Sequence, residues 1–296
     1  MPSEASHRRS VDSLLAVLDL SASGARTTED IFTGTSQPMP SGRVYGGQVA
    51  AQALVAAQRT LPEGRAAHSM HGYFLRPGDA DHDITFSVDR IHDGRSFSTR
   101  RTQAFQNGVP IFSMISSFQD DGPGVEHAAP IPEGVPDPEE LAPDHTLSDG
   151  TEITALRALG ERPADIRHVQ TPLYLDAPAD AERVPHQAVW MRMRAPLPDG
   201  DGLHRAALAY LSDMTIQESV LRAHGVSWST PGLKVASLDH AMWWHRPARV
   251  DDWLLYVQES PNARGGRGLA HGRIYTRAGI FVASVAQEIM IRVPEA

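Results

Sequence analysis

The chain has 296 residues, 41% of them hydrophobic and 21% charged, which is a globular composition with room for one large domain or two of ordinary size. The absence of cysteine excludes disulfides, thiolate nucleophiles and cysteine-ligated metal sites. A net charge of −9 argues against general nucleic-acid binding. No apolar run reaches the about 18 residues that a membrane span requires.

The first half is predicted to contain one buried helix and several strands. Apolar residues at positions 11, 14, 15 and 18 have helical spacing and predict an outer packing helix, and residues 29–34 form a plausible strand. Residues 45–57 are small or apolar nearly all round, which is typical of a helix buried on every side. A curved antiparallel sheet wrapped around this helix would bury it. The strand-like segments that follow are residues 68–75, 82–91, 97–106 and 109–118.

An acidic, proline-rich segment separates the two halves. Residues 120–149 hold six prolines and neither lysine nor arginine, so they are predicted to form a linker or a connection that follows the surface. We therefore expect an N-terminal domain over residues 1–119, a linker over 120–160 and a C-terminal domain over 161–296.

The second half repeats the order of the first. A helix-like run near residues 211–224 is followed by strand-like segments at 234–245, 253–259, 267–276 and 280–291. The residues Phe-Leu-Arg-Pro at 74–77 match Trp-His-Arg-Pro at 244–247. A repeat of this length indicates a duplicated domain rather than a solenoid.

Three polar residues lie in otherwise apolar surroundings. Asp213 interrupts the apolar run 206–216, where a carboxylate is costly to bury unless it is hydrogen-bonded; its other interpretation is a helix N-cap. Gln287 falls on an apolar strand face by period-2 alternation, and Ser237 lies within a strand-like segment. Each of the three also has an ordinary structural interpretation, which stays open from position alone.

Common catalytic and metal-binding motifs are absent from the sequence. Neither G-x-S-x-G nor H-E-x-x-H occurs. The histidine pairs 68/71 and 240/245 have odd separations, so their members point to opposite faces of a strand and are interpreted as polar residues at strand edges. The glycine-rich residues 265–268 are interpreted as a hairpin loop.

Longer stretches resemble the acyl-CoA thioesterase II family, the TesB type. In the first half these are residues 43–49 (RVYGGQV), 68–79 (HSMHGYFLRPGD) and 93–100 (DGRSFSTR). In the second half they are residues 210–213 (YLSD), 238–247 (LDHAMWWHRP) and 282–288 (VASVAQE). The resemblance implies an α+β double hotdog fold: two repeats of a long buried helix, each wrapped by a curved antiparallel β-sheet.

The resemblance also implies hydrolysis of fatty acyl-CoA to a free fatty acid and CoA. The family holds a water with an aspartate, a hydroxyl residue and a glutamine, and these match Asp213, Ser237 and Gln287. Asp213 would accept the proton of the water as general base, and the other two would orient it.

The resemblance to hotdog enzymes places the donors for the oxyanion at the start of the first buried helix, at Gly47 and Gln48. The CoA phosphates need cations, and Lys234 is the only lysine, so arginines are expected to hold them. The candidates are Arg95, Arg100, Arg264 and Arg267.

Two alternatives remain at this stage. A hotdog enoyl-CoA hydratase needs an aspartate and a histidine on the catalytic helix, and the next histidine after Asp213 is His224. A non-catalytic acyl-CoA binding protein could retain the fold. In either case we expect an acyl-CoA ligand, no metal or cofactor, no nucleic-acid or membrane partner, a homo-oligomer of two or more chains, and a cytoplasmic bacterial setting.

Overall fold

The computed structural model describes residues 3–24, 27–39, 41–144, 162–174 and 183–293. Its α-helices are α1 (Glu4–Leu18), α2 (Gly46–Gln58), α4 (Asp201–Ser212) and α5 (Glu218–Ala223), with a 3₁₀ turn η1 at Pro138–Glu140. The strands of the first half are β1 (Ser21–Ala22), β2 (Asp30–Gly34), β3 (Ala66–Phe74), β4 (Ile84–Asp93), β5 (Phe97–Gln106) and β6 (Val109–Gln119). Those of the second half are β7 (Ala164–His168), β8 (His186–Met193), β9 (Lys234–Ser237), β10 (Asp239–Trp244), β11 (Leu254–Arg264), β12 (Arg267–Thr276) and β13 (Phe281–Arg292).

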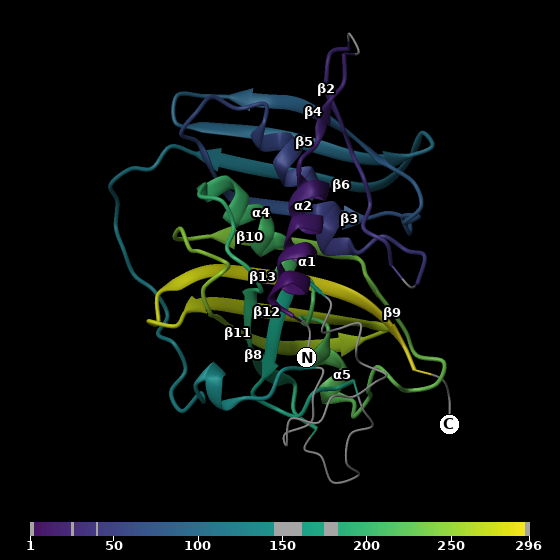
Figure 1. Ribbon diagram of the computed structural model, residues 1–296, viewed down its shortest axis with the longest axis vertical. Helices are drawn as coiled ribbons and strands as arrows, with labels where there is room; N and C mark the ends of the chain where they lie inside the picture. Colours follow the sequence, from purple (N-terminus) through teal and green to yellow (C-terminus); the bar gives the residue numbers. More distant parts are fainter. Residues whose placement is uncertain (1–2, 25–26, 40, 145–161, 175–182, 294–296) are drawn as a thin grey trace.

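All the strands join one continuous 13-stranded sheet that curves around α2 and α4 (Figure 1). The first half has the order β2-β4-β5-β6-β3 and the second half the same order in β8-β11-β12-β13-β10. The halves meet where β3 pairs antiparallel with β10. This confirms the predicted double hotdog, in which each repeat consists of a helix wrapped by a curved antiparallel sheet.

An approximate twofold axis relates the halves. The matched residues 74–77 and 244–247 make β3 and β10 equivalent strands, and in this match His71 corresponds to Ala241. These two residues also pair with each other, so the axis passes between them. The buried helices follow the same symmetry and run antiparallel. The Tyr45 hydroxyl at the start of α2 donates to Tyr210 O near the end of α4 (2.8 Å), and Gln58 at the end of α2 donates to the carbonyl of Gly202 at the start of α4 (3.3 Å).

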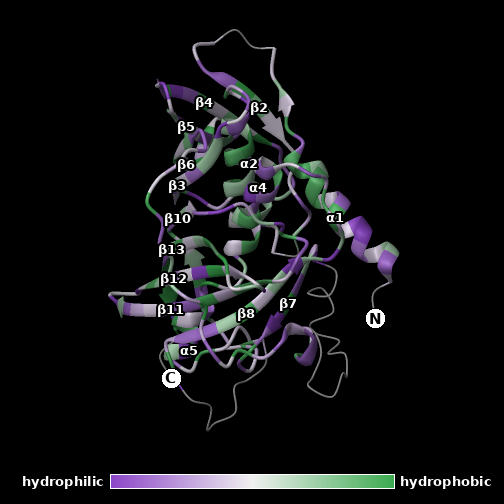
Figure 2. Cartoon of the chain, turned by 90° about the vertical axis from the view of Figure 1, so that its left-hand side faces the viewer, coloured by the Kyte–Doolittle hydropathy of each residue, from purple (hydrophilic) through white to green (hydrophobic). Residues whose placement is uncertain are grey.

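The two central helices lie inside the molecule, and α1 lies on their far side from the sheet (Figure 2). The first of them, α2, is buried as predicted, because its alanines let sheet and helix pack closely around it. The main core includes residues of both halves, so they share one hydrophobic interior. None of the helices in the described ranges is long and apolar enough to cross a membrane.

Two predictions for the second half were wrong. The helix expected at 211–224 is two helices: α4 already begins at Asp201, and a turn through Asp213–Gln217 separates it from α5. Asp213 is consequently the C-cap of α4 and not an N-cap. The strand expected at 234–245 is interrupted at Leu238, where the Asp239 carboxylate accepts a bond from the backbone N–H of Glu288 (2.7 Å). Strands β7 and β8 were not predicted.

Residues 120–144, here called the strap, cross the outer face of the second half (Figure 1, left side). Their apolar side chains Ile131, Val135 and Leu141 pack on a second hydrophobic cluster that includes Trp190 and Trp253. The two indoles also donate hydrogen bonds to the strap, at Pro136 O (2.9 Å) and at a carboxylate oxygen of Glu139 (3.0 Å). The connection therefore follows the surface, one of the two forms predicted; residues 145–160 of the predicted linker lie outside the described ranges.

Two hairpins have tight two-residue turns, one of them in the hairpin loop predicted at 265–268. Asn107 and Gly108 adopt positive φ angles of 50° and 75°, and Gly265 and Gly266 adopt 62° and 73°. Both pairs join adjacent antiparallel strands, as expected for two-residue turns in which φ is positive at both central positions.

Candidate active site

A buried carboxylate lies where the two central helices meet. Asp213 follows α4 directly and is 3% exposed. The start of α2 faces it: the backbone N–H of Gly47 donates to the carboxylate. A Cβ atom added to Gly46 would come within 2.8 Å of Asp213 Oδ2, so a side chain at this position would prevent the approach. The N-terminal end of a helix also favours a negative charge, which helps to hold the ionised group here.

The structure brings Asp213, Ser237 and Gln287 together from α4, β9 and β13. The hydroxyl of Ser237 donates to Asp213 Oδ1 at 3.2 Å. The Gln287 amide nitrogen donates to the same oxygen at 2.9 Å and to Ser237 Oγ at 2.7 Å. Two donors thus converge on Oδ1, while Oδ2 faces the start of α2.

Burial raises the pKa of Asp213 above the usual carboxyl range. The neighbouring His240 and the hydrogen bonds from Gln287, Ser237 and the Gly47 N–H act in the opposite direction but do not cancel it. A carboxylate with a raised pKa is a stronger base, so this environment favours proton abstraction near neutral pH.

His240 is a member of this cluster that sequence reasoning missed. Its Nδ1 lies 2.6 Å from Gln287 Oε1 and its Nε2 lies 2.9 Å from Ser212 Oγ. The side chain is 1% exposed, so its interpretation as a polar residue at a strand edge was wrong. The sequence did contain a signal for this position. Alternate residues of β10 face the interior, so His240 lies on the same buried face as Met242 and Trp244.

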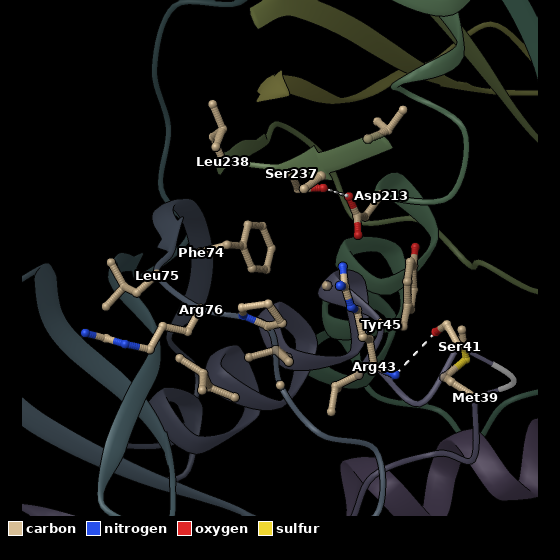
Figure 3. A pocket seen from close by; sticks show the side chains of 18 of the residues that line it. Met39, Ser41, Arg43, Tyr45, Phe74, Leu75, Arg76, Asp213, Ser237 and Leu238 are labelled. Atoms are coloured by element: carbon tan, nitrogen blue, oxygen red, sulfur yellow. Dashed lines mark hydrogen bonds between the residues drawn. The ribbon is translucent and has the colours of Figure 1, made fainter. Parts of the chain in front are cut away.

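A cavity of about 380 Å³ adjoins the carboxylate. Asp213 and Ser237 line it together with Gln217, and Phe74 faces the same space (Figure 3). Most of its other walls are apolar: Val44, Val49, Leu75, Ile111, Val235 and Leu238. The cavity can therefore accommodate an apolar group next to a polar reaction centre.

Two arginines that the sequence did not single out also line this cavity. Arg43 points toward Asp213, whereas Arg76 lies on the other side of Phe74 and points away from the carboxylate (Figure 3). Both belong to stretches that resemble the thioesterase II family, so that match was the available signal.

The predicted phosphate-binding arginines lie elsewhere. Arg100 is fully buried and bonded to Thr60 and Asp93, which contradicts its prediction as a CoA contact. Arg95, Arg264 and Arg267 are exposed at hairpin tips and do not belong to the cavity lining.

The predicted oxyanion donors differ in what they are bonded to. Gln48 is fully buried; its backbone N–H donates to Tyr45 O (3.1 Å) and its side chain donates to Gln52 (3.1 Å). This contradicts its prediction as an oxyanion donor. Gly47 lies beside the site, but its N–H donates to Asp213, so its role as an oxyanion donor stays a prediction. Within the described ranges, no group of His, Asp and Glu side chains is placed to hold a metal ion.

Comparison with solved structures defines the class. The structure is similar to that of acyl-CoA thioesterase II TesB2 from Mycobacterium marinum, with a TM-score of 0.77 and 42% identity over 95% of this chain and 99% of that one. At 10% identity and a TM-score of 0.53, the dehydratase domain of PpsC from Mycobacterium tuberculosis shares the fold over 94% of this chain and 99% of that chain. A protein with a hotdog fold from Alicyclobacillus acidocaldarius also matches, with a TM-score of 0.76 and 17% identity over 96% of this chain and 99% of that one, so the fold is that of the hotdog proteins.

Sequence comparison then gives the family. A model described as acyl-CoA thioesterase matches residues 160–290, and one described as acyl-CoA thioesterase N-terminal domain matches residues 35–119. The chain is 37% identical to acyl-CoA thioesterase 2 of Haemophilus influenzae, over 90% of this chain and 93% of that protein. It is 38% identical to human acyl-coenzyme A thioesterase 8, over 90% of this chain and 85% of that protein. The chain belongs to the acyl-CoA thioesterase family, and to its TesB type.

Proposed function

We propose that the protein hydrolyses fatty acyl-CoA, using a water activated by Asp213 and oriented by Ser237 and Gln287. One observation carries this proposal: a buried carboxylate has one oxygen fixed by two donors and the other beside an apolar cavity. The family assignment supplies the substrate class.

The chemistry follows from the two oxygens of the carboxylate. Oδ1 is held by Ser237 and Gln287, so Oδ2 is the oxygen placed to accept a proton from a water in the cavity. The water oxygen bonds to the thioester carbonyl carbon while its proton passes to Asp213. The tetrahedral intermediate then expels the CoA sulfur, which takes that proton and leaves as the thiol, and the fatty acid remains. Ser237 and Gln287 orient the water through the carboxylate that they hold in place, and fixing the water in advance lowers the entropic part of the barrier.

Enoyl-CoA hydration is the weaker candidate. It requires an acid and a base that both face the substrate. The histidine of the site, His240, lies behind Gln287, is not part of the cavity lining, and uses both ring nitrogens in hydrogen bonds. A histidine is therefore near Asp213, but in a position suited to support rather than to proton exchange with a ligand.

Thiol release tests the proposed function directly. Acyl-CoAs of graded chain length are incubated with the protein, and free CoA is followed with a chromogenic disulfide. We expect thiol release, and the cysteine-free chain adds no background. Binding of acyl-CoA without thiol release at any length would refute the proposal and favour a binding protein. Loss of the enoyl absorbance without thiol release would favour a hydratase.

Arg76 is our candidate for holding the CoA phosphates. It is exposed at the cavity. Within the described residues its guanidinium makes one hydrogen bond, from Nη1 to Pro110 O (2.8 Å), so Nε and Nη2 remain as donors for a phosphate. It points away from Asp213, as required of a phosphate contact that is separated from the thioester by the length of the pantetheine arm (Figure 3).

Replacing Arg76 by alanine is expected to raise KM for acyl-CoA about 10-fold, the equivalent of one charge-assisted hydrogen bond. KM for the matching acyl-N-acetylcysteamine thioester, which lacks phosphates, should not change. The variants Arg95→Ala, Arg264→Ala and Arg267→Ala test the hairpin arginines predicted from the sequence in the same assay. If Arg76→Ala raised KM equally for acyl-CoA and for the acyl-N-acetylcysteamine thioester, Arg76 would not be a phosphate contact.

A further inference from the structure

We propose that His240 is a positioning residue that fixes the orientation of the Gln287 amide toward Asp213. This inference rests on the proposed function, because it assigns a role within the same water-binding site. Neither His240 nor Gln287 belongs to the cavity lining. His240 contacts Gln287, which in turn bonds to the lining residues Asp213 and Ser237, so His240 acts through Gln287 and not on the substrate.

The hydrogen bonds determine which way the amide faces. A glutamine amide has one accepting end and one donating end, and rotation by half a turn exchanges them. Gln287 Oε1 lies 2.6 Å from His240 Nδ1, so this nitrogen must carry a proton and donate it. The amide nitrogen is then directed at Asp213 and Ser237, with one N–H for each. Without the imidazole donor, the amide could turn its oxygen toward the carboxylate, where the two would repel each other.

The other ring nitrogen anchors the imidazole to the catalytic turn. His240 Nε2 lies 2.9 Å from Ser212 Oγ, and Ser212 directly precedes Asp213. The backbone carbonyl of Ser212 in turn accepts a bond from Tyr256 (3.1 Å). His240 therefore connects the end of α4, which carries the base, to β13, which carries the amide.

The other half of the molecule shows the same positions without this polar chain. The twofold axis through His71 and Ala241 places Met70 where the second half has His240. Met70 pairs with Ser116 on β6. Ser116 also pairs with β5 as Gln287 pairs with β12, so it occupies the place of Gln287 on β13. The fold thus forms with an apolar residue at this point, so His240 is not a requirement of the hotdog architecture itself.

Three substitutions separate the two nitrogens of the ring. In His240→Asn the amide nitrogen can take the place of Nδ1, and in His240→Gln that of Nε2; His240→Met introduces the residue of the first half and removes both. We expect kcat to fall about 10- to 100-fold in the glutamine and methionine variants, the range that is typical of residues that orient metal ligands in enzymes. KM should change little, and the asparagine variant should retain most of the activity. His245→Met, an exposed position just beyond the same strand, is the matched control.

A double-mutant cycle with Gln287→Ala completes the test. If His240 acts through Gln287, His240→Met should cause no further loss of kcat once the amide is gone. Full additivity of the two losses, or equal losses in the asparagine and glutamine variants, would overturn the inference. If Gln287→Ala alone leaves kcat unchanged, the water-binding mechanism itself fails, and thiol release by the unaltered protein still reports on the activity.

Discussion

Replacing Asp213 by asparagine is expected to lower kcat about 10²- to 10⁴-fold, the contribution of a positioned general base. Asparagine keeps the size of the side chain and can still occupy the space between Gln287 and Ser237. Substrate binding should therefore persist, so the loss should appear in kcat rather than in KM. Steady-state thiol release measures both, and Asp252→Asn, at an exposed aspartate, is the control. Unchanged turnover in Asp213→Asn would exclude this residue as the base.

The same substitution should also change stability in a defined direction. Burial raises the pKa of Asp213 in the folded protein, so the folded state holds its proton at pH values where the unfolded state has lost it. The free energy of unfolding therefore decreases as pH rises from the unfolded to the folded pKa, and stays lowered above it. Asp213→Asn removes this cost, so its Tm should exceed that of the unaltered protein at neutral pH. The activity of the unaltered protein requires the ionised carboxylate, so it should rise as the pH approaches and passes the raised pKa of Asp213.

Adding a methyl group at Gly47 is expected to weaken the fold. A Cβ atom there would lie 2.6 Å from Tyr210 O and 2.6 Å from the ring of Tyr45, where α2 crosses α4. A backbone carbonyl cannot move without displacing α4. We therefore expect Gly47→Ala to lower the free energy of unfolding by about 1–3 kcal/mol, the usual cost of overpacking. Chemical denaturation measures this change.

The neighbouring glycine provides the matched comparison. In Gly46→Ala the added Cβ would contact Asp213 Oδ2 (2.8 Å) and the Phe74 ring (3.1 Å), both of which are side-chain atoms that border the cavity. We expect Gly46→Ala to be more stable than Gly47→Ala. It should lose activity instead, because the methyl group occupies space beside the base. Equal losses of stability in the two variants would contradict the claim that only Gly47 is needed for the close approach of α2 and α4.

The sequence was most informative where the pattern was continuous. The buried helix at 45–57 and the glycine-rich hairpin loop at 265–268 follow from local chemistry, and the structure has both. Asp213, Ser237 and Gln287 were each singled out by position, but their grouping into one site came from resemblance, since no local pattern relates residues near α4, β9 and β13.

The errors arose where tertiary contacts decide the outcome. The end of α4 is set by Asp213 leaving the helix to meet α2, a partner far away in the sequence. Arg100 looks like any other hairpin arginine until its burial against Thr60 is known. To predict that His240 is buried, one must know that β10 lies in the interior of the sheet, and this position depends on the pairing of β10 with β3.

The differences across the twofold axis bear on stoichiometry. An enzyme assembled from two identical single-repeat subunits must carry two equal reaction centres, since any substitution appears in both. Here both repeats belong to one polypeptide, and the positions of His240 and Gln287 are filled by Met70 and Ser116 in the first half. Each repeat could therefore change independently, one toward chemistry and the other toward packing. A tight active-site inhibitor should accordingly titrate one reaction centre for every chain of 296 residues rather than one for every repeat.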